Sequence, residues 1–121
     1  MKKRFQYILC FSFIFILLGC SGNKIEKQSE KIIKHIQNNE FTEVINLGND
    51  DLKSHFSAEQ LESMWQQTNE GLGKYVKIEE HIIDESDQQT TDLVVVNYQN
   101  GTLRFTLTYD SSQKLSNIYI K

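Results

Sequence analysis

The chain has 121 residues, of which 13 are Lys or Arg and 16 are Asp or Glu, and its two cysteines stand at positions 10 and 20. This length allows one modest domain. The acidic balance disfavours a nucleic-acid-binding role, because a phosphate backbone is bound by basic surfaces.

The N-terminus has the pattern of an export signal. Three basic residues at positions 2–4 precede an apolar run at positions 5–18, which is too short to span a hydrocarbon core of ~30 Å as a helix. The sequence Leu-Leu-Gly-Cys at positions 17–20 resembles the lipobox of bacterial lipoproteins. This resemblance implies cleavage after Gly19 and diacylation of Cys20. An ordinary secretory signal, or a retained membrane helix, is the alternative.

The lipobox resemblance divides the chain into three parts: a signal peptide at 1–19, a lipidated cysteine with a short linker at 20–23, and a single domain at 24–121. The domain then has no cysteine beyond the anchor, so we expect neither a disulfide nor a thiolate metal site. We expect a protein outside the cytoplasm, anchored by lipid to the bacterial cell membrane. The Lys, Ile and Asn content favours a Gram-positive host, whereas a Gram-negative host would place the protein in the outer membrane.

The first half of the domain has helical periodicity. Isoleucines recur at helical spacing over residues 24–38, which predicts an amphipathic helix. Four lysines follow one another at intervals of three or four residues and share one face of this helix: Lys24, Lys27, Lys31 and Lys34. They are candidate membrane-facing residues, since each lysine near an anionic surface contributes about 1 kcal/mol. A solvated helix face is the alternative.

Further helices are marked by their capping residues. A short helix is expected at Glu40–Leu47, with Gly48 as its C-cap. The segment 49–51 reads as the N-cap and first turn of another helix. Ser57 to Gln60 match a capping box, which predicts the start of a helix that ends at the glycines of positions 71–73.

From Tyr75 onward the apolar residues alternate with a period of two, which predicts strands. Four strands are expected: Tyr75–Ile83, Thr91–Gln99, Thr102–Tyr109 and Leu115–Ile120. A polar loop at Asp84–Gln89 joins the first two.

An Asn-Gly pair at positions 100–101 predicts a type I′ hairpin turn. That turn places Val96 opposite Phe105, and a tight turn at 111–112 then places Ile118 beside Phe105. Every pair on this face is apolar except at its far end, where Asp92 faces a tyrosine. The pattern predicts one half-buried antiparallel sheet covered by helices, which is an α+β fold.

Several short motifs resemble a bacterial family of unknown function, number 3887. They are the run Phe-Ser-Ala-Glu-Gln-Leu at 56–61, Trp65, and Gly-Lys-Tyr at 73–75 before the first strand. The resemblance covers about residues 30–121. It implies a nuclear-transport-factor-2-like or cystatin-like cone, in which a curved four-stranded antiparallel sheet wraps the N-terminal helices and can leave a pocket. It supplies no catalytic residues.

A pocket in such a cone has a small set of candidate residues: Trp65, Glu80, Asp92, Tyr98 and Tyr109. Alternation along the first strand places Glu80 inward among apolar residues, where its pKa would rise and it could act as a general base. A bulge that turns Glu80 to solvent is the alternative. The three histidines lack metal-ligand spacing, so neither a metal nor a cofactor is expected.

Two classes of function remain. The first is a non-catalytic surface lipoprotein whose domain binds a partner protein, a peptide or a small ligand next to the membrane. The second is a pocket enzyme that uses general acid–base catalysis by an inward carboxylate. A concave pocket with a buried carboxylate would favour the enzyme, and a filled interior would favour the binding protein.

Overall fold

The computed structural model describes residues 24–121, so the expected signal peptide, Gly19 and Cys20 lie outside the described residues. The described chain begins with a helix over residues 24–37. Three shorter helices follow: α2 (Phe41–Asn46), α3 (Asp50–His55) and α4 (Ala58–Asn69). The remainder is one antiparallel sheet in chain order: β1 (Tyr75–Ser86), β2 (Gln89–Tyr98), β3 (Gly101–Tyr109) and β4 (Leu115–Ile120). The predicted α+β fold is confirmed.

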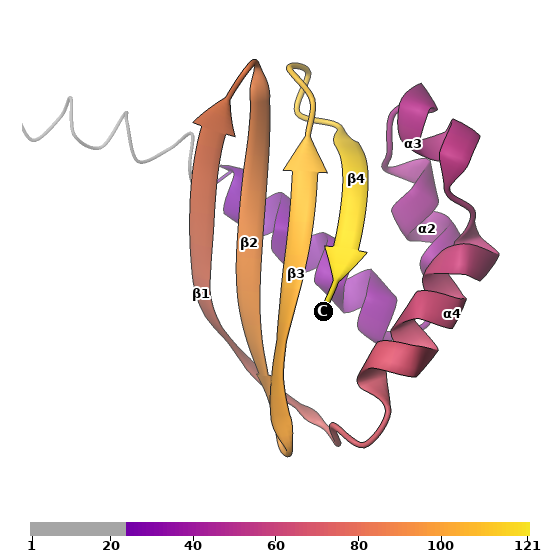
Figure 1. Cartoon of the computed structure of the whole chain (residues 1–121), viewed down its shortest axis with the longest axis vertical. Coiled ribbons are helices and arrows are strands. Elements are labelled where there is room, and N and C mark those ends of the chain that lie inside the picture. The colour runs from indigo at the N-terminus through magenta and orange to yellow at the C-terminus, as the bar shows by residue number, and fades with distance from the viewer. Residues whose placement is uncertain (1–23) are drawn as a thin grey trace, which may run out of the picture.

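The N-terminal helix (residues 24–37) crosses one face of the sheet, and α2, α3 and α4 stand beside β4 (Figure 1). The core lies between this helix and the sheet, where Ile32, Val94 and Phe105 are fully buried. The β4 edge is covered, because the N–H of Asn49 before α3 donates to the carbonyl of Leu115 at 2.8 Å. β1 forms the opposite edge. Within residues 24–121 no helix is long and apolar enough to cross a membrane.

The starts of α3 and α4 follow the sequence pattern. The Asn49 side chain accepts a hydrogen bond from the N–H of Leu52 at 2.9 Å, and Ser57 forms the predicted capping box with Gln60. Gly48 differs from the prediction, because its φ is not positive. A Cβ at this position would instead collide with the Leu52 side chain. Glycine is therefore required here by the close approach of α3.

The β2–β3 hairpin has the predicted faces but not the predicted register. Tyr98 pairs with Gly101, and Val96 pairs with Leu103, so the turn is formed by residues 99–100 and the pairing is displaced by two residues. Neither turn residue has the positive φ that a type I′ turn requires. Because side chains alternate with a period of two, a displacement of two residues leaves each one on its predicted face.

The connection between α4 and β1 fixes this turn. The N–H of Asn100 donates to the carbonyl of Leu72 at 2.9 Å, and the N–H of Gln99 donates to the carbonyl of Lys74 at the same distance. A Cβ on Gly101 would lie 2.8 Å from Leu72 Cδ2. The glycine therefore makes room for a leucine rather than supplying a left-handed conformation.

The β3–β4 turn is longer than the predicted one at 111–112. The carboxylate of Asp110 accepts hydrogen bonds from two backbone N–H groups of the turn, at 2.9 and 3.0 Å. As a result Ile118 lies opposite Leu107 and not beside Phe105.

β1 is the strand that departs most from its prediction. It continues to Ser86, and the turn that follows is formed by residues 87–88, both with positive φ, so the predicted polar loop is mostly strand. Val76 and Glu79 have no partner in β2 and are bulges. Each bulge inserts one residue into the strand and reverses the alternation of its side chains.

Candidate functional site

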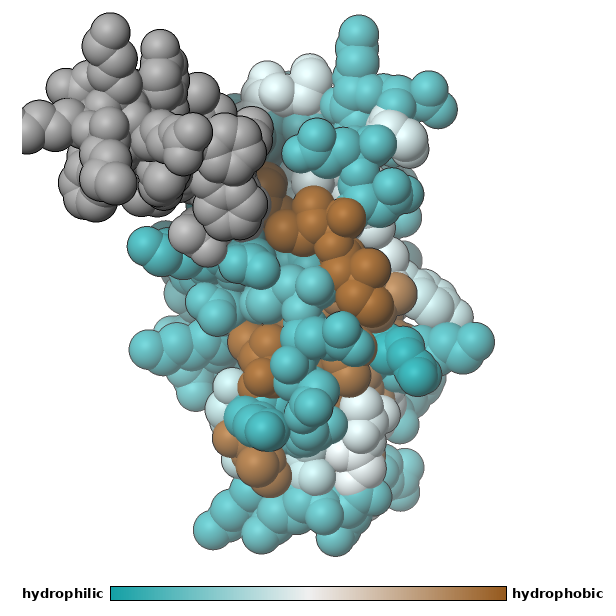
Figure 2. All heavy atoms as spheres, turned by 90° about the vertical axis from the view of Figure 1, so that its left-hand side faces the viewer, coloured by the Kyte–Doolittle hydropathy of each residue, from teal (hydrophilic) through white to brown (hydrophobic). Residues whose placement is uncertain are grey.

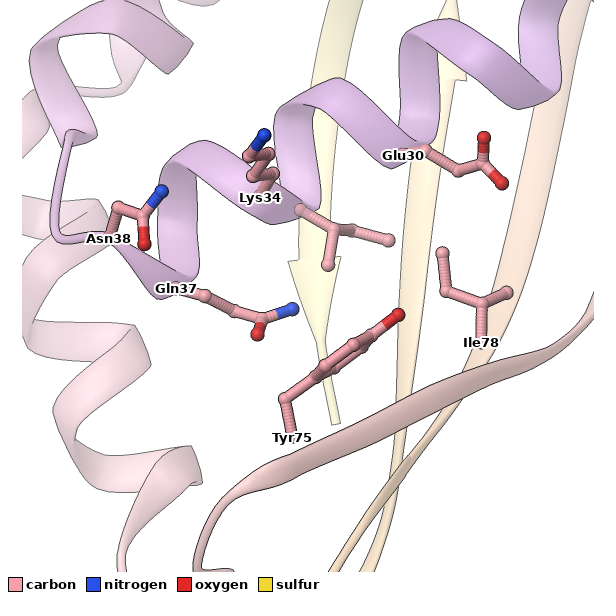
Figure 3. A pocket seen from close by; sticks show the side chains of 7 residues that line it. Glu30, Lys34, Gln37, Asn38, Tyr75 and Ile78 are labelled. Atoms are coloured by element: carbon pink, nitrogen blue, oxygen red, sulfur yellow. The ribbon is translucent and has the colours of Figure 1, made fainter.

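A groove of about 370 Å³ lies between the N-terminal helix and the start of β1. Its lining comes from one face of the helix and from two residues of β1: Glu30, Ile33, Lys34, Gln37, Asn38, Tyr75 and Ile78. In Figure 3 the Tyr75 hydroxyl and the Glu30 carboxylate both extend toward the space above Ile78. An apolar floor with a few polar groups around it is the usual form of a ligand site.

A buried acid–histidine pair lies at the Glu30 end of the groove. Asp92 is fully buried, and its Oδ2 lies 2.8 Å from Nδ1 of His81. Nε2 of His81 lies 3.8 Å from the Glu30 carboxylate. A buried carboxylate is costly unless it is paired, so His81 explains how the valine-rich strand β2 accommodates Asp92. His81 also links that buried acid to the groove.

The N-terminal helix is fixed to the sheet beside this pair. The hydroxyls of Ser29 and Tyr109 lie 2.7 Å apart, and the side-chain amide of Gln28 donates to the carbonyl of Gln113 at 3.0 Å. Burial raises the pKa of Tyr109 far above its ordinary value, the hydrogen bond with Ser29 lowers it in part, and the charge of Asp92 raises it again. The Tyr109 hydroxyl therefore stays neutral and holds the helix in place.

Aromatic side chains pack beneath the other end of the groove. The Trp65 ring lies 6.3 Å from Tyr98 and 6.0 Å from Phe105, and Tyr75 meets Tyr98 edge to face at 6.1 Å. Burial raises the pKa of Tyr98 well above its ordinary value, and the neighbouring Tyr75 adds to this. Within residues 24–121 the buried Tyr98 hydroxyl has no hydrogen-bond partner.

The groove and the pair beside it lie within a segment that matches a known family. The profile of DUF3887, a family of proteins of unknown function, matches residues 29–118. The chain belongs to the DUF3887 family. None of the curated proteins compared with it matches. Its fold is similar to the NMR structure of a protein from Ruminococcus gnavus ATCC 29149, with a TM-score of 0.67 and 20% identity over 80% of this chain and 88% of that one. At that identity the likeness concerns the fold alone.

For Glu80 this DUF3887 domain has the second of the two placements considered, in which a bulge turns the side chain to solvent, and not the inward one. The bulge at Glu79 reverses the alternation after Ile78, so Glu80 pairs with Val95 on the outer face and is exposed. His81 takes the inward position instead, opposite the buried Val94. The condition that favoured a catalytic Glu80, a carboxylate inside an apolar pocket, is therefore not met.

The other predicted pocket residues lie on the inner side but are not brought together at the groove. Asp92, Tyr98 and Tyr109 face the helix, as the alternation predicts, and Trp65 is 4% exposed in the core. None of them lines the groove. Of the residues that line the groove, only Lys34 was a predicted site residue, and it was predicted to face the membrane. The others were not predicted, because a groove between a helix and an edge strand depends on how the two elements cross. His81 was missed because no local signal marks the bulge that turns it inward.

The four candidate membrane-facing lysines (Lys24, Lys27, Lys31 and Lys34) are all exposed on the N-terminal helix. The buried isoleucines occupy the face toward the sheet, so the amphipathic helix predicted from the spacing is confirmed. Contact of the lysines with lipid remains a prediction. Lys34 also lies at the rim of the groove, and Figure 3 shows its ammonium group directed away from Tyr75 and Ile78.

Proposed function

We propose that this DUF3887 protein is a lipid-anchored bacterial surface protein whose domain binds a partner segment in the groove between the N-terminal helix and β1. The groove is the single observation that carries the proposal. Its volume of about 370 Å³ is at the small end of the range for ligand sites, which suits one or two side chains of a bound segment better than a large cofactor.

Several features support binding over catalysis. Asp92 is the buried carboxylate that acid–base chemistry would use, but one of its oxygens contacts His81 and its side chain is fully buried. The core side chains cluster in the interior of the fold, and the groove lies at its edge. A general base must come within hydrogen-bond reach of its substrate, and Asp92 has no such access from the groove.

The lipid anchor of the proposal rests on the lipobox resemblance at Cys20. Only three residues separate that cysteine from Lys24, the first described residue, so the anchor would hold the domain close to the membrane. The exposed lysines of the helix would then face anionic lipid. Metabolic labelling with a palmitate analogue should mark the wild-type protein and not Cys20→Ser. Equal labelling of both proteins would contradict the lipid anchor and would have no bearing on the groove as a binding site.

Site-specific photocrosslinking tests the groove. A photoreactive amino acid at Gln37, which lines the groove, should give a defined adduct in native membranes. The matched control carries it at Thr102, which is exposed on the outer face of β3. An adduct from both positions, or from Thr102 alone, would contradict the groove as the binding site.

A further inference from the structure

We propose that the groove recognises a lysine or arginine side chain of an extended, basic partner peptide. This inference rests on the proposed function and adds the chemistry of the occupant. It is drawn from the polar groups that face the groove, the apolar floor beneath them and the acidic charge of β1.

Among the polar groups that converge on the groove, the Glu30 carboxylate accepts hydrogen bonds, whereas the Gln37 amide and the Tyr75 hydroxyl can both donate and accept them. Figure 3 shows the Glu30 carboxylate and the Tyr75 hydroxyl directed toward the space around Ile78, while the Gln37 amide is directed toward the Tyr75 ring and the Lys34 ammonium points away. The Glu30 side chain is 51% exposed, and its one ion-pair contact within residues 24–121 is His81, at 3.8 Å. The carboxylate therefore keeps its capacity to accept charge-assisted hydrogen bonds from a ligand.

The floor suits the long stem of a basic side chain. Ile33 and Ile78 offer apolar contact for methylene groups, which Lys and Arg side chains bury while their charged heads stay polar. Tyr75 lies beside them and is 44% exposed. The face of its ring can attract a cation, a contact worth about 0.5–1 kcal/mol at exposed sites. A carboxylate, an aromatic ring and an apolar floor together match a guanidinium or ammonium group on an alkyl chain.

Of the two walls of the groove, β1 favours a basic partner, whereas the N-terminal helix carries the four exposed lysines described above. β1 carries four acidic residues, all exposed, against one lysine: Glu79, Glu80, Asp84 and Glu85, with Lys77. Figure 2 shows the β1 side of the molecule with exposed apolar side chains set among hydrophilic ones. On β1, Val76 and Ile82 are 54% and 50% exposed. A peptide in which basic and apolar residues alternate complements this surface in both charge and hydrophobicity.

Two other occupants fit less well. A strand added to the free edge of β1 would need regular backbone pairing, and the bulges at Val76 and Glu79 interrupt it next to the groove. A second copy of this chain would bring the same acidic β1 toward itself, and like charges facing one another disfavour that contact. Recognition through one anchored basic side chain meets neither obstacle.

Fluorescence anisotropy with three short peptides tests the inference on the full chain in nanodiscs of phosphatidylcholine, a lipid without net charge. The probes are Gly-Leu-Arg-Leu-Gly and two versions in which citrulline or glutamate replaces arginine. Citrulline keeps the shape of arginine and removes its charge. We expect the arginine peptide to bind about tenfold more tightly than the citrulline peptide, and the glutamate peptide not to bind.

Variants of the protein locate the effect. Glu30→Gln should abolish the preference for arginine over citrulline, and the matched control Glu80→Gln, which removes an exposed carboxylate outside the groove, should keep it. Tyr75→Leu should also reduce the preference for arginine over citrulline. It gives a second test of the groove if Glu30→Gln fails to fold. Equal binding of the arginine and citrulline peptides would overturn the inference, and so would concentration-dependent self-association in place of peptide binding. In either case a photocrosslinked adduct at Gln37 would still support the groove as a binding site. Failure of every peptide together with no adduct at Gln37 would overturn both.

Discussion

The buried pair of Asp92 and His81 allows a quantitative test of the packing described above. Asp92→Val would leave Nδ1 of His81 without its partner at 2.8 Å, and a buried donor or acceptor left unpaired costs about 1–3 kcal/mol. His81→Leu would leave a fully buried carboxylate without its hydrogen-bond partner, and breaking a buried pair that holds a charged group costs about 3–5 kcal/mol. Each variant alone should therefore be clearly destabilised.

The double variant should be less destabilised than His81→Leu alone, because it removes both polar groups and replaces them with apolar ones. Exchanges of this kind in other proteins are often neutral or stabilising. We expect a coupling of about 2 kcal/mol between the two positions, well above the ~0.5 kcal/mol within which independent sites add. A loss of 2 kcal/mol in a domain of this size lowers Tm by roughly 8–16 °C.

Urea unfolding at pH 7 gives these free energies, with the fluorescence of the single tryptophan as the signal. Trp65 is 4% exposed and should report the loss of the core. The wild type, both single variants and the double variant complete the cycle. Additive effects of the two substitutions would refute the reasoning, because they would mean that Asp92 and His81 do not depend on each other.

Three further predictions follow from local geometry. The hydrogen bond from Asn49, and next the one from the N–H of Lys114, lower the pKa of Asp110. The contribution of the Asp110 carboxylate to stability is therefore present at neutral pH and lost as pH falls below the ordinary pKa value of 3.8. The Tm difference between wild type and Asp110→Asn should shrink in acid, and a difference that stays constant with pH would contradict this. Gly101→Ala should cost at most about 1 kcal/mol, because the new methyl group meets only the end of the Leu72 side chain, which can shift, and Leu72→Ala should relieve that loss in urea unfolding. Ser57→Ala should cost about 1 kcal/mol by removing the α4 cap, and an unchanged unfolding midpoint would argue against the cap.

The parts of the fold that could be predicted are those set by local sequence. The isoleucine spacing of the N-terminal helix, the Ser57 capping box and the alternation of β2 and β3 depend on neighbouring residues, and the structure confirms them. The hairpin register failed because its turn is held by the backbone carbonyl of Leu72, which lies far away in sequence. An Asn-Gly pair is a strong local signal, and here a tertiary contact overrides it.

The candidate site was harder to predict for the same reason. One bulge, at Glu79, decides whether Glu80 or His81 faces inward, and nothing in the sequence of β1 distinguishes the two outcomes. A carboxylate among valines in β2 does predict a hidden partner, because Asp92 could not be buried alone. That reasoning identifies the need for a group such as His81 but not its position.

The most direct test of the groove is the protection of a single engineered cysteine in living cells. The described domain contains no cysteine, so Gln37→Cys introduces one thiol at the groove and Thr102→Cys places one on the outer face as a matched control. We expect a maleimide to label the Gln37→Cys protein more slowly in intact cells than after purification, and to label Thr102→Cys at equal rates in both. Equal rates for Gln37→Cys in cells and after purification would contradict a bound partner in the groove.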